Sequence, residues 1–134
     1  MIISFVGLGE VGSTYASGLA QNGANVKGYD ILFDTIGKEN FKKCEDAGVQ
    51  LVDSPEELIA DADIIIAVTA CSLAMETART YKPYLKKNQR YVELNSAVPD
   101  IKKEVEDYLG DTCLFVDGTT LSSPSQFGVA TPIM

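Results

Sequence analysis

The sequence predicts a doubly wound α/β domain in which about six mostly parallel strands carry helices on both faces. The first observation behind this prediction is that short apolar runs recur along the 134 residues and alternate with stretches of helical spacing. The second is that the runs are apolar nearly throughout, which is typical of parallel strands buried on both faces. The third is that no long linker or low-complexity tract interrupts the alternation. We therefore expect one domain over residues 1–134, with the strand order 3-2-1-4-5-6.

Each element of this alternation has a local signal. Runs rich in β-branched and aromatic residues predict strands at 2–6, 25–29, 49–52, 63–68, 90–94 and 113–116. Apolar residues at helical spacing predict helices at 10–22, 35–47, 73–86 and 101–109, the last starting near Pro99. A further helix is expected after Ser54, which is followed by proline and then glutamate at the positions of a capping box. Glycines at 23, 48 and 110 are predicted to end helices.

Composition and charge narrow the functional class. The net charge is −8, and the lysines fall in pairs separated by acids, which predicts solvated helix faces. The pairs are Lys42–Lys43, Lys86–Lys87 and Lys102–Lys103. Nucleic-acid binding needs a clustered basic surface, so no nucleic-acid partner is expected. Because no apolar stretch approaches the roughly 18 residues of a membrane span, and no signal sequence is visible at the N-terminus, we expect no membrane partner and a cytoplasmic protein.

Cysteine and histidine usage bears on metals and redox chemistry. Cys44, Cys71 and Cys113 are odd in number and far apart in the sequence. No disulfide framework or metal site is therefore expected, and all three are predicted to be reduced and partly buried. The sequence contains no histidine, which excludes a histidine general base or a histidine-ligated metal within this chain.

The stretch VGLGEVG places glycines at 7, 9 and 12 directly after the first expected strand, with the spacing G-x-G-x-x-G. In a Rossmann-type fold the first glycine allows a tight turn, the second lets a pyrophosphate approach the backbone, and the third lets the helix pack closely on the sheet. The helix that begins near Glu10 would direct free N–H groups at the phosphates, with the Glu10 side chain pointing to solvent. The alternative is a turn whose small residues serve packing alone, and the surrounding strand, helix and acid favour nucleotide binding.

Asp30 closes the second expected strand, within reach of an adenosine ribose. A carboxylate there accepts hydrogen bonds from ribose hydroxyls and repels a 2′-phosphate. The following ILFD contains no arginine to hold such a phosphate, although Lys38 offers a cation nearby in the sequence. The predicted cofactor is therefore NAD in preference to NADP.

Three stretches give the chain a family resemblance. They are GLGEVGSTYASGLAQNGANVKGYD near the N-terminus, ELNSAVP at 93–99 and FVDGTTLSS at 115–123. Together and in this order they resemble the β-hydroxyacid dehydrogenase family, which includes 6-phosphogluconate dehydrogenase and 3-hydroxyisobutyrate dehydrogenase. The resemblance implies an NAD(P)-dependent oxidoreductase that transfers a hydride between a nicotinamide cofactor and a small hydroxy acid.

The resemblance also implies roles for individual positions. Residues at the pyrophosphate loop are Gly7, Leu8, Gly9, Glu10, Val11 and Gly12, and Asp30 corresponds to the ribose contact. Val68, Thr69 and Ala70 correspond to the segment that borders the cofactor after the fourth strand. Asn95 and Ser96 fall on the pair that contacts the nicotinamide end, the alternative being a capping turn before the Pro99 helix.

The third motif departs most from the family pattern. The family serine that helps to bind a substrate carboxylate aligns with Leu121, and substrate contacts are placed by resemblance at Thr119, Thr120, Ser122 and Ser123. A hydroxyl-rich loop after a strand is as often a loop without such a role. The family's catalytic lysine lies after this domain, so the catalytic residues stay unknown here.

The expected whole is a cofactor-binding domain that ends before a helical C-terminal substrate domain, with GVATPIM resembling the start of the family's last strand in this domain. Such a chain is expected to bind NAD with little turnover on its own, and to self-associate through apolar surface around CLFV and ATPIM. Two other classes stay open. A non-catalytic nucleotide-sensing module shares the glycine motif and the acid, and a methyltransferase also uses a glycine loop followed by an acid.

Overall fold

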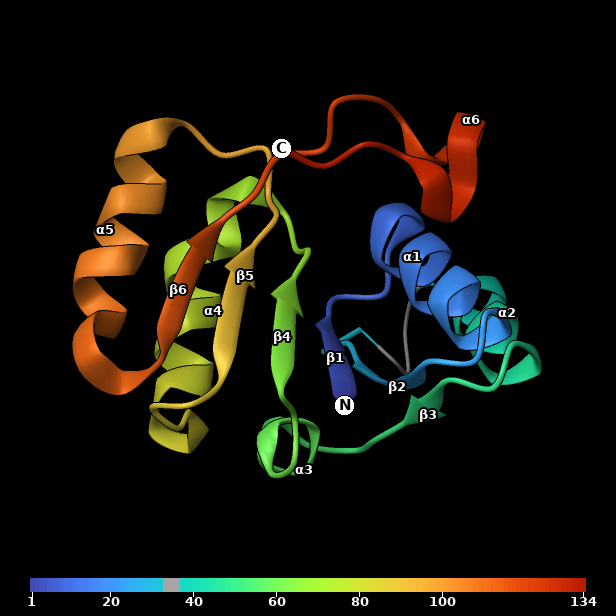
Figure 1. Ribbon diagram of the computed structural model, residues 1–134, viewed down its shortest axis with the longest axis horizontal. Coiled ribbons are helices and arrows are strands. Elements are labelled where there is room, and N and C mark those ends of the chain that lie inside the picture. The colour runs from blue at the N-terminus through green and yellow to red at the C-terminus, as the bar shows by residue number, and fades with distance from the viewer. Residues whose placement is uncertain (33–36) are drawn as a thin grey trace.

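The computed structural model describes residues 1–32 and 37–134, and its core is one six-stranded parallel sheet (Figure 1). The strands are β1 Ile2–Val6, β2 Asn25–Tyr29, β3 Gln50–Leu51, β4 Ile64–Ala67, β5 Arg90–Glu93 and β6 Leu114–Asp117. Their order is β3-β2-β1-β4-β5-β6, which confirms the predicted topology. The order reverses between β1 and β4, where a crevice opens at the carboxyl ends of the strands in folds of this kind.

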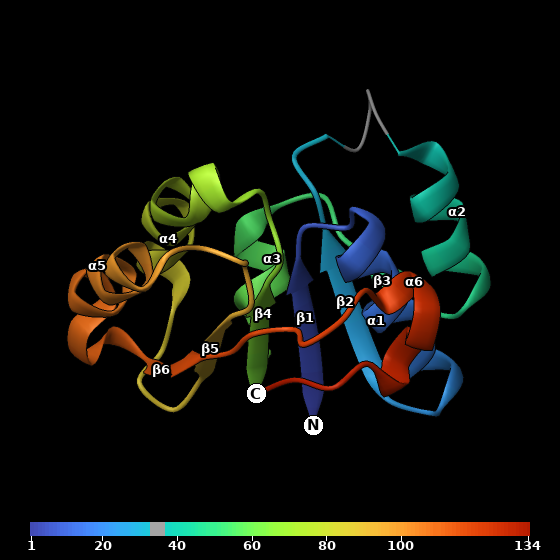
Figure 2. The same cartoon turned by 90° about the horizontal axis from the view of Figure 1, so that it is seen from above.

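The helices are α1 Glu10–Gln21, α2 Lys38–Asp46, α3 Pro55–Ile59, α4 Ala74–Tyr81, α5 Pro99–Leu109 and α6 Pro124–Phe127. In both views α4 and α5 lie beside β4–β6, while α1, α2 and α6 lie towards β1–β3 (Figures 1 and 2). Buried side chains form two clusters, one packed under α1 and α2 and one under α3, α4 and α5. The sheet is therefore covered on both faces, as its continuous apolar strands require.

Helix ends follow the local chemistry of the sequence. Ser54 caps α3 by accepting a hydrogen bond from the backbone N–H of Glu57. The predicted stops at 23, 48 and 110 are all glycines with positive φ just past a helix. The helix expected over 73–86 is wrong at its end, because α4 stops at Tyr81 and a 3₁₀ turn, Lys82–Tyr84, follows. Pro83 has no N–H to donate and its ring collides with the preceding helical turn. Of the helix expected over 35–47, positions 35 and 36 lie outside the described residues.

The chain after β6 folds back across α1 instead of adding a strand to the parallel sheet. The helix α6 and a 3₁₀ turn, Gly128–Ala130, lie against α1, and Tyr15 Oη donates a hydrogen bond to the carbonyl of Thr131 at 3.3 Å. Among the described residues, the regular pairing that this segment makes is an antiparallel bridge between Thr120 and Ile133. The GVATPIM stretch thus packs against α1 and pairs with residues 119–121.

Two expectations about burial are corrected. Cys44 and Cys113 are buried, but Cys71 is exposed at the start of the turn before α4. Lys102 is buried and not part of a solvated face, because its ammonium forms an ion pair with Asp117. Within residues 1–32 and 37–134, no helix has the length and apolar character to cross a membrane, and no cluster of acidic or sulfur ligands fits a metal ion.

Candidate functional site

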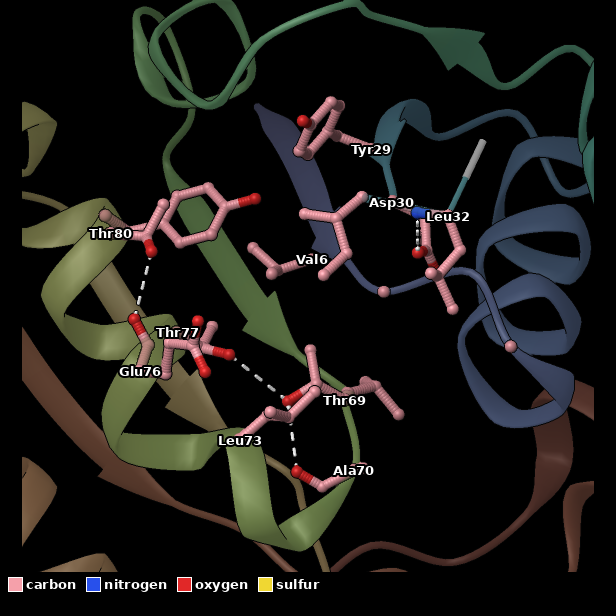
Figure 3. A pocket seen from close by; sticks show the side chains of 15 residues that line it. Val6, Tyr29, Asp30, Leu32, Thr69, Ala70, Leu73, Glu76, Thr77 and Thr80 are labelled. Atoms are coloured by element: carbon pink, nitrogen blue, oxygen red, sulfur yellow. Dashed lines mark hydrogen bonds between the residues drawn. The ribbon is translucent and has the colours of Figure 1, made fainter. Parts of the chain in front are cut away.

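A cavity of about 340 Å³ opens at the switch point between β1 and β4 (Figure 3). Its floor is the carboxyl ends of the central strands, and its lining is mostly apolar. Of the residues predicted from the sequence, the lining includes Gly7, Gly9, Asp30, Val68, Thr69 and Ala70. The prediction therefore identified the two sides of this cavity that come from the glycine turn and from the loop after β4.

The three glycines of the turn have different structural reasons. Gly7 adopts φ +93°, and a Cβ there would lie 2.2 Å from the carbonyl oxygen of Val68. A Cβ on Gly12 would lie 2.0 Å from the carbonyl oxygen of Gly7, so the close approach is to the turn itself as much as to the sheet. Gly9 differs, because no atom of the described residues would lie within 4 Å of an added Cβ. The space in front of Gly9 is thus left open on the cavity side.

The N-terminus of α1 faces this space. Gly9 is the N-cap and has no side chain with which to satisfy the first N–H groups of the helix, which lack partners inside any helix. Glu10 is exposed, as expected, and the adjoining Val11 packs against the core under α1. A helix start of this kind attracts an anion through its N–H groups and its dipole.

Asp30 is fixed against the glycine turn. Its Oδ2 accepts a hydrogen bond from the backbone N–H of Leu8 at 2.8 Å, and its Oδ1 accepts one from Leu32 at 2.9 Å, the latter drawn in Figure 3. Leu8 itself is buried, with its side chain against Gly28. A carboxylate has about four lone-pair positions, so both oxygens keep acceptor capacity toward the cavity. The carboxylate is oriented before any ligand arrives.

Asn95 is buried behind Thr69 and does not reach the surface. Its Oδ1 accepts a hydrogen bond from the backbone N–H of Thr69 at 2.6 Å, and its Nδ2 donates to Thr69 Oγ1 at 3.3 Å. The alternative role as a helix cap is wrong, because the N-cap of α5 is Val98 and α5 has no side-chain cap. Ser96, the next residue, is exposed at the same edge of the sheet. Asn95 thus shapes a cavity-lining loop, and Ser96 is the one of the pair open to a ligand.

Sequence reasoning missed the wall that α4 and the end of β2 contribute. The residues concerned are Tyr29, Ile31, Leu32, Leu73, Glu76, Thr77, Thr80 and Tyr81. Thr77 Oγ1 lies 3.3 Å from Thr69 Oγ1, so this wall is tied to the loop after β4 (Figure 3). Burial raises the pKa of the Tyr81 hydroxyl, and the nearby Tyr29 and Asp30 raise it further, so it stays protonated. Their spacing gives a usable signal, since positions 73, 77, 80 and 81 share one helical face after a central strand.

The four residues proposed for the substrate do not line the cavity. Thr119 exchanges backbone hydrogen bonds with Met134, and Thr120 forms the bridge to Ile133. Ser122 has a buried Oγ without a partner among the described residues, and Ser123 Oγ lies 2.6 Å from Ser125 Oγ. All of them follow β6 at the same edge of the sheet as the cavity, but it is the later segment, α6 and the turn at 128–130, that contacts α1.

A buried polar cluster that the sequence did not suggest lies at the same edge of the sheet as the cavity, outside its lining. Lys102 Nζ donates to Asp117 Oδ1 at 2.6 Å, to the carbonyl of Gly118 at 2.5 Å and to the carbonyl of Glu93 at 3.3 Å. Glu93 is fully buried, and burial raises the pKa of its carboxyl despite the attraction of Lys102. A signal existed, because Lys102 lies three residues before Val105 and seven before Leu109 on the buried stripe of α5.

Comparisons with known proteins identify relatives in sequence and in fold. The human mitochondrial 3-hydroxyisobutyrate dehydrogenase is 29% identical over 107 residues, which are 77% of this chain and 30% of the human protein. A conserved hypothetical protein from Sinorhizobium meliloti 1021 superposes with a TM-score of 0.90 at 26% identity, over 99% of this chain and 46% of that one.

The 3-hydroxyisobutyrate dehydrogenase of Mycobacterium tuberculosis, solved with L-serine, has a TM-score of 0.81 at 18% identity over 92% of this chain and 42% of that one. The chain thus spans less than half the length of these relatives. The family model for the NAD-binding domain of 6-phosphogluconate dehydrogenase matches residues 2–123. The chain therefore belongs to the family of the NAD-binding domain of 6-phosphogluconate dehydrogenase.

Proposed function

We propose that this chain binds NAD in the cavity at the switch point, as the cofactor-binding domain of an oxidoreductase that acts on a small hydroxy acid. The observation that carries the proposal is the open space in front of Gly9, which faces an uncapped helix N-terminus and lies beside a carboxylate already fixed by the same turn. The N–H groups of Gly9, Glu10, Val11 and Gly12 would hold the diphosphate. Bound there, NAD supplies the hydride acceptor.

The other ends of the dinucleotide have matching surfaces. Asp30 would accept hydrogen bonds from the hydroxyls of the adenosine ribose, through the lone pairs that its backbone partners leave free. The largely apolar wall of Tyr29, Leu32 and Leu73 suits a flat adenine ring. Val68, Thr69 and Ala70 would border the nicotinamide half, with Ser96 at its far side.

The preference for NAD over NADP rests on the charge of the cavity rim. The rim carries the acids Asp30 and Glu76, and none of its described residues is lysine or arginine. A 2′-phosphate next to Asp30 would meet a like charge, while Lys38 is exposed at the start of α2 and does not line the cavity. We expect binding without turnover of a hydroxy acid by these 134 residues, because none of the described cavity-lining residues is a lysine that could relay the substrate proton.

The test is a titration with NADH and NADPH followed by fluorescence and calorimetry. We expect NADH to bind more tightly, and the Gly9→Val variant to lose binding while its circular dichroism and melting temperature stay close to those of the parent chain. Asp30→Ala should weaken NADH and narrow the gap to NADPH, whereas Asp53→Ala, which removes an exposed acid after β3, should change neither. Flat traces with both coenzymes for folded protein would refute the proposal.

Two further expectations stay proposals of the same kind. We propose that the chain self-associates through the apolar side chains exposed on β6 and near the C-terminus, such as Leu114 at 50% and Ile133 at 51% exposure. Contact of Thr119, Thr120, Ser122 and Ser123 with a substrate would require this loop to move toward the cavity, because none of the four lines it. The cytoplasmic location stays a prediction from the sequence, since the human relative is named as mitochondrial.

A further inference from the structure

The cluster around Lys102 joins three elements at the edge of the sheet that bears the cavity. Lys102 belongs to α5, Glu93 ends β5, and Asp117 ends β6 directly opposite Glu93 in the strand register. The ammonium has three hydrogens, and it has three acceptors, namely one carboxylate oxygen and two backbone carbonyls. All three of its donors are thus engaged, so Lys102 cross-links the ends of β5 and β6 and is not placed to carry a proton. We call Lys102 and its three hydrogen bonds the brace.

A buried ammonium is costly unless it is fully hydrogen-bonded. The Lys102 side chain is only 6% exposed, whereas that of its ion-pair partner Asp117 is 59% exposed. The bonds to the carbonyls of Glu93 and Gly118 fix the backbone where β5 and β6 end. Moving either carbonyl away would leave one hydrogen of the buried ammonium without an acceptor, which is unfavourable. The distance between the ends of β5 and β6 is therefore fixed by the two hydrogen bonds.

The brace continues to the cavity through hydrogen bonds. Glu93 Oε1 accepts the backbone N–H of Asn95 at 3.0 Å, which closes a tight turn after β5. Asn95 Oδ1 in turn accepts the backbone N–H of Thr69 at 2.6 Å. Thr69 lines the cavity. A connected path therefore runs from a helix on the outside of the sheet to the loop that faces the proposed nicotinamide half.

The opposite half of the cavity is held separately. The glycine turn is anchored by the bond from Leu8 N–H to Asp30, and among the described residues the hydrogen bonds of Lys102 do not reach this turn. We propose that Lys102 is a positioning residue which, through Glu93 and Asn95, holds the Thr69 loop and the turn at Ser96 in the shape that receives the nicotinamide half of the cofactor. The inference rests on the proposed function, and it predicts that the loss of Lys102 affects the binding of the nicotinamide half and not that of the adenosine half.

The experiment compares two ligands in Lys102→Met, which keeps the length of the side chain and removes its charge and donors. ADP carries the adenosine ribose and the diphosphate but no nicotinamide, while NADH carries both halves. We expect the affinity for NADH to fall about tenfold and the affinity for ADP to stay within about twofold of the parent chain. Lys103→Met is the matched control, because Lys103 is the adjacent lysine with a side chain 72% exposed, and it should change neither affinity.

A role in stability alone would lower both affinities together or neither, and either result would overturn the inference. If Lys102→Met does not fold, Asp117→Asn answers the same question, since it removes the charge at the exposed end of the brace and keeps an oxygen acceptor. We expect it to weaken NADH about threefold without changing ADP, and equal effects on the two ligands would again count against the brace. If the parent chain binds neither ADP nor NADH, the proposed function itself fails.

Discussion

At the scale of single residues, the glycine turn separates positions required by the fold from one left free for a ligand. An added Cβ on Gly12 meets the carbonyl oxygen of Gly7 at 2.0 Å, a backbone atom that cannot move without opening the turn. Gly9, in an extended conformation that alanine adopts without strain, meets open space. The same motif therefore contains two kinds of glycine with different physical reasons.

The first prediction follows from this difference. Gly12→Ala should lower the free energy of unfolding by about 3 kcal/mol, because the collision is with backbone. Gly9→Ala should change it by less than about 0.5 kcal/mol, as a surface substitution does, while weakening NADH about tenfold. Urea denaturation and NADH titration of the two variants measure both effects. Equal destabilisation by the two alanines would contradict this assignment.

The second prediction concerns the buried carboxyl of Glu93. Burial raises its pKa above the ordinary value of 4.5, so just above pH 4.5 the folded chain keeps a proton that the unfolded chain has lost. The folded state then binds more protons, and the free energy of unfolding falls as the pH rises through the window between the two pKa values. Glu93→Gln cannot titrate and should flatten this fall, which for one group is at most about 1.4 kcal/mol per pH unit.

Denaturation midpoints measured from pH 4.5 to 7 test this expectation. Glu104→Gln removes an exposed glutamate on α5 and controls for the loss of one negative charge. Stability curves of Glu93→Gln and the parent chain that run parallel across the range would show that Glu93 titrates alike in the folded and unfolded chains.

At the scale of elements, the sequence was sufficient for the topology, because short strand signals alternate with helical ones and each pair of successive strands is joined through a helix. Its errors lie where tertiary contacts override local pattern. The helix expected over 73–86 stops at Tyr81, two residues before Pro83. The prediction followed the apolar spacing and gave too little weight to this proline. The sequence predicts Lys102 on a solvated face because it stands in a lysine pair among acids, but adjacent residues lie on different sides of a helix, and only Lys103 of the pair is exposed.

The candidate site divides in the same way. The turn at 7–12 and Asp30 were predictable because their chemistry lies within one strand–helix–strand unit. The wall from α4 and the partnership of Asn95 with Thr69 depend on how β4 and β5 align, which local sequence does not encode. Asn95 was expected to contact the nicotinamide end, and the structure places it one layer behind.

The third prediction tests the segment that folds back over α1. A Cβ on Gly18 would lie 2.7 Å from Val129 Cβ, so Gly18→Ala should push the 124–131 segment off the helix. The alanine itself favours the helix by about 1 kcal/mol, so overall stability should hardly fall. Amide exchange should quicken at Thr131, whose N–H bonds within this segment, and at Leu121 and Met134, whose N–H groups bond between the residues that flank it. Gln21→Ala, an exposed change in the same helix, is the control and should leave these rates unchanged.

At the scale of the whole molecule, the two faces of the sheet are unequally covered near β6. Phe115 packs into the core under α4 and α5, whereas Leu114 and Val116 point to the other face and are 50% and 40% exposed. On that face, α1 and α2 form their core over β1–β3. An edge strand with neighbouring exposed apolar side chains favours association with another chain.

The last prediction is that this edge makes the chain a dimer or larger assembly in solution. Val116→Lys replaces one of the two exposed apolar side chains of β6 by an ammonium, which is unfavourable to bury unpaired in an interface. The substitution leaves the core side of β6 unchanged. Sedimentation equilibrium should show the parent chain above monomer mass and Val116→Lys shifted toward the monomer. Glu104→Lys, which changes the charge by more but on exposed α5, should sediment like the parent chain. The cavity opens between β1 and β4, away from the edge strand β6, so Val116→Lys should leave the affinity for NADH unchanged. A parent chain that stays monomeric at high concentration would contradict the prediction.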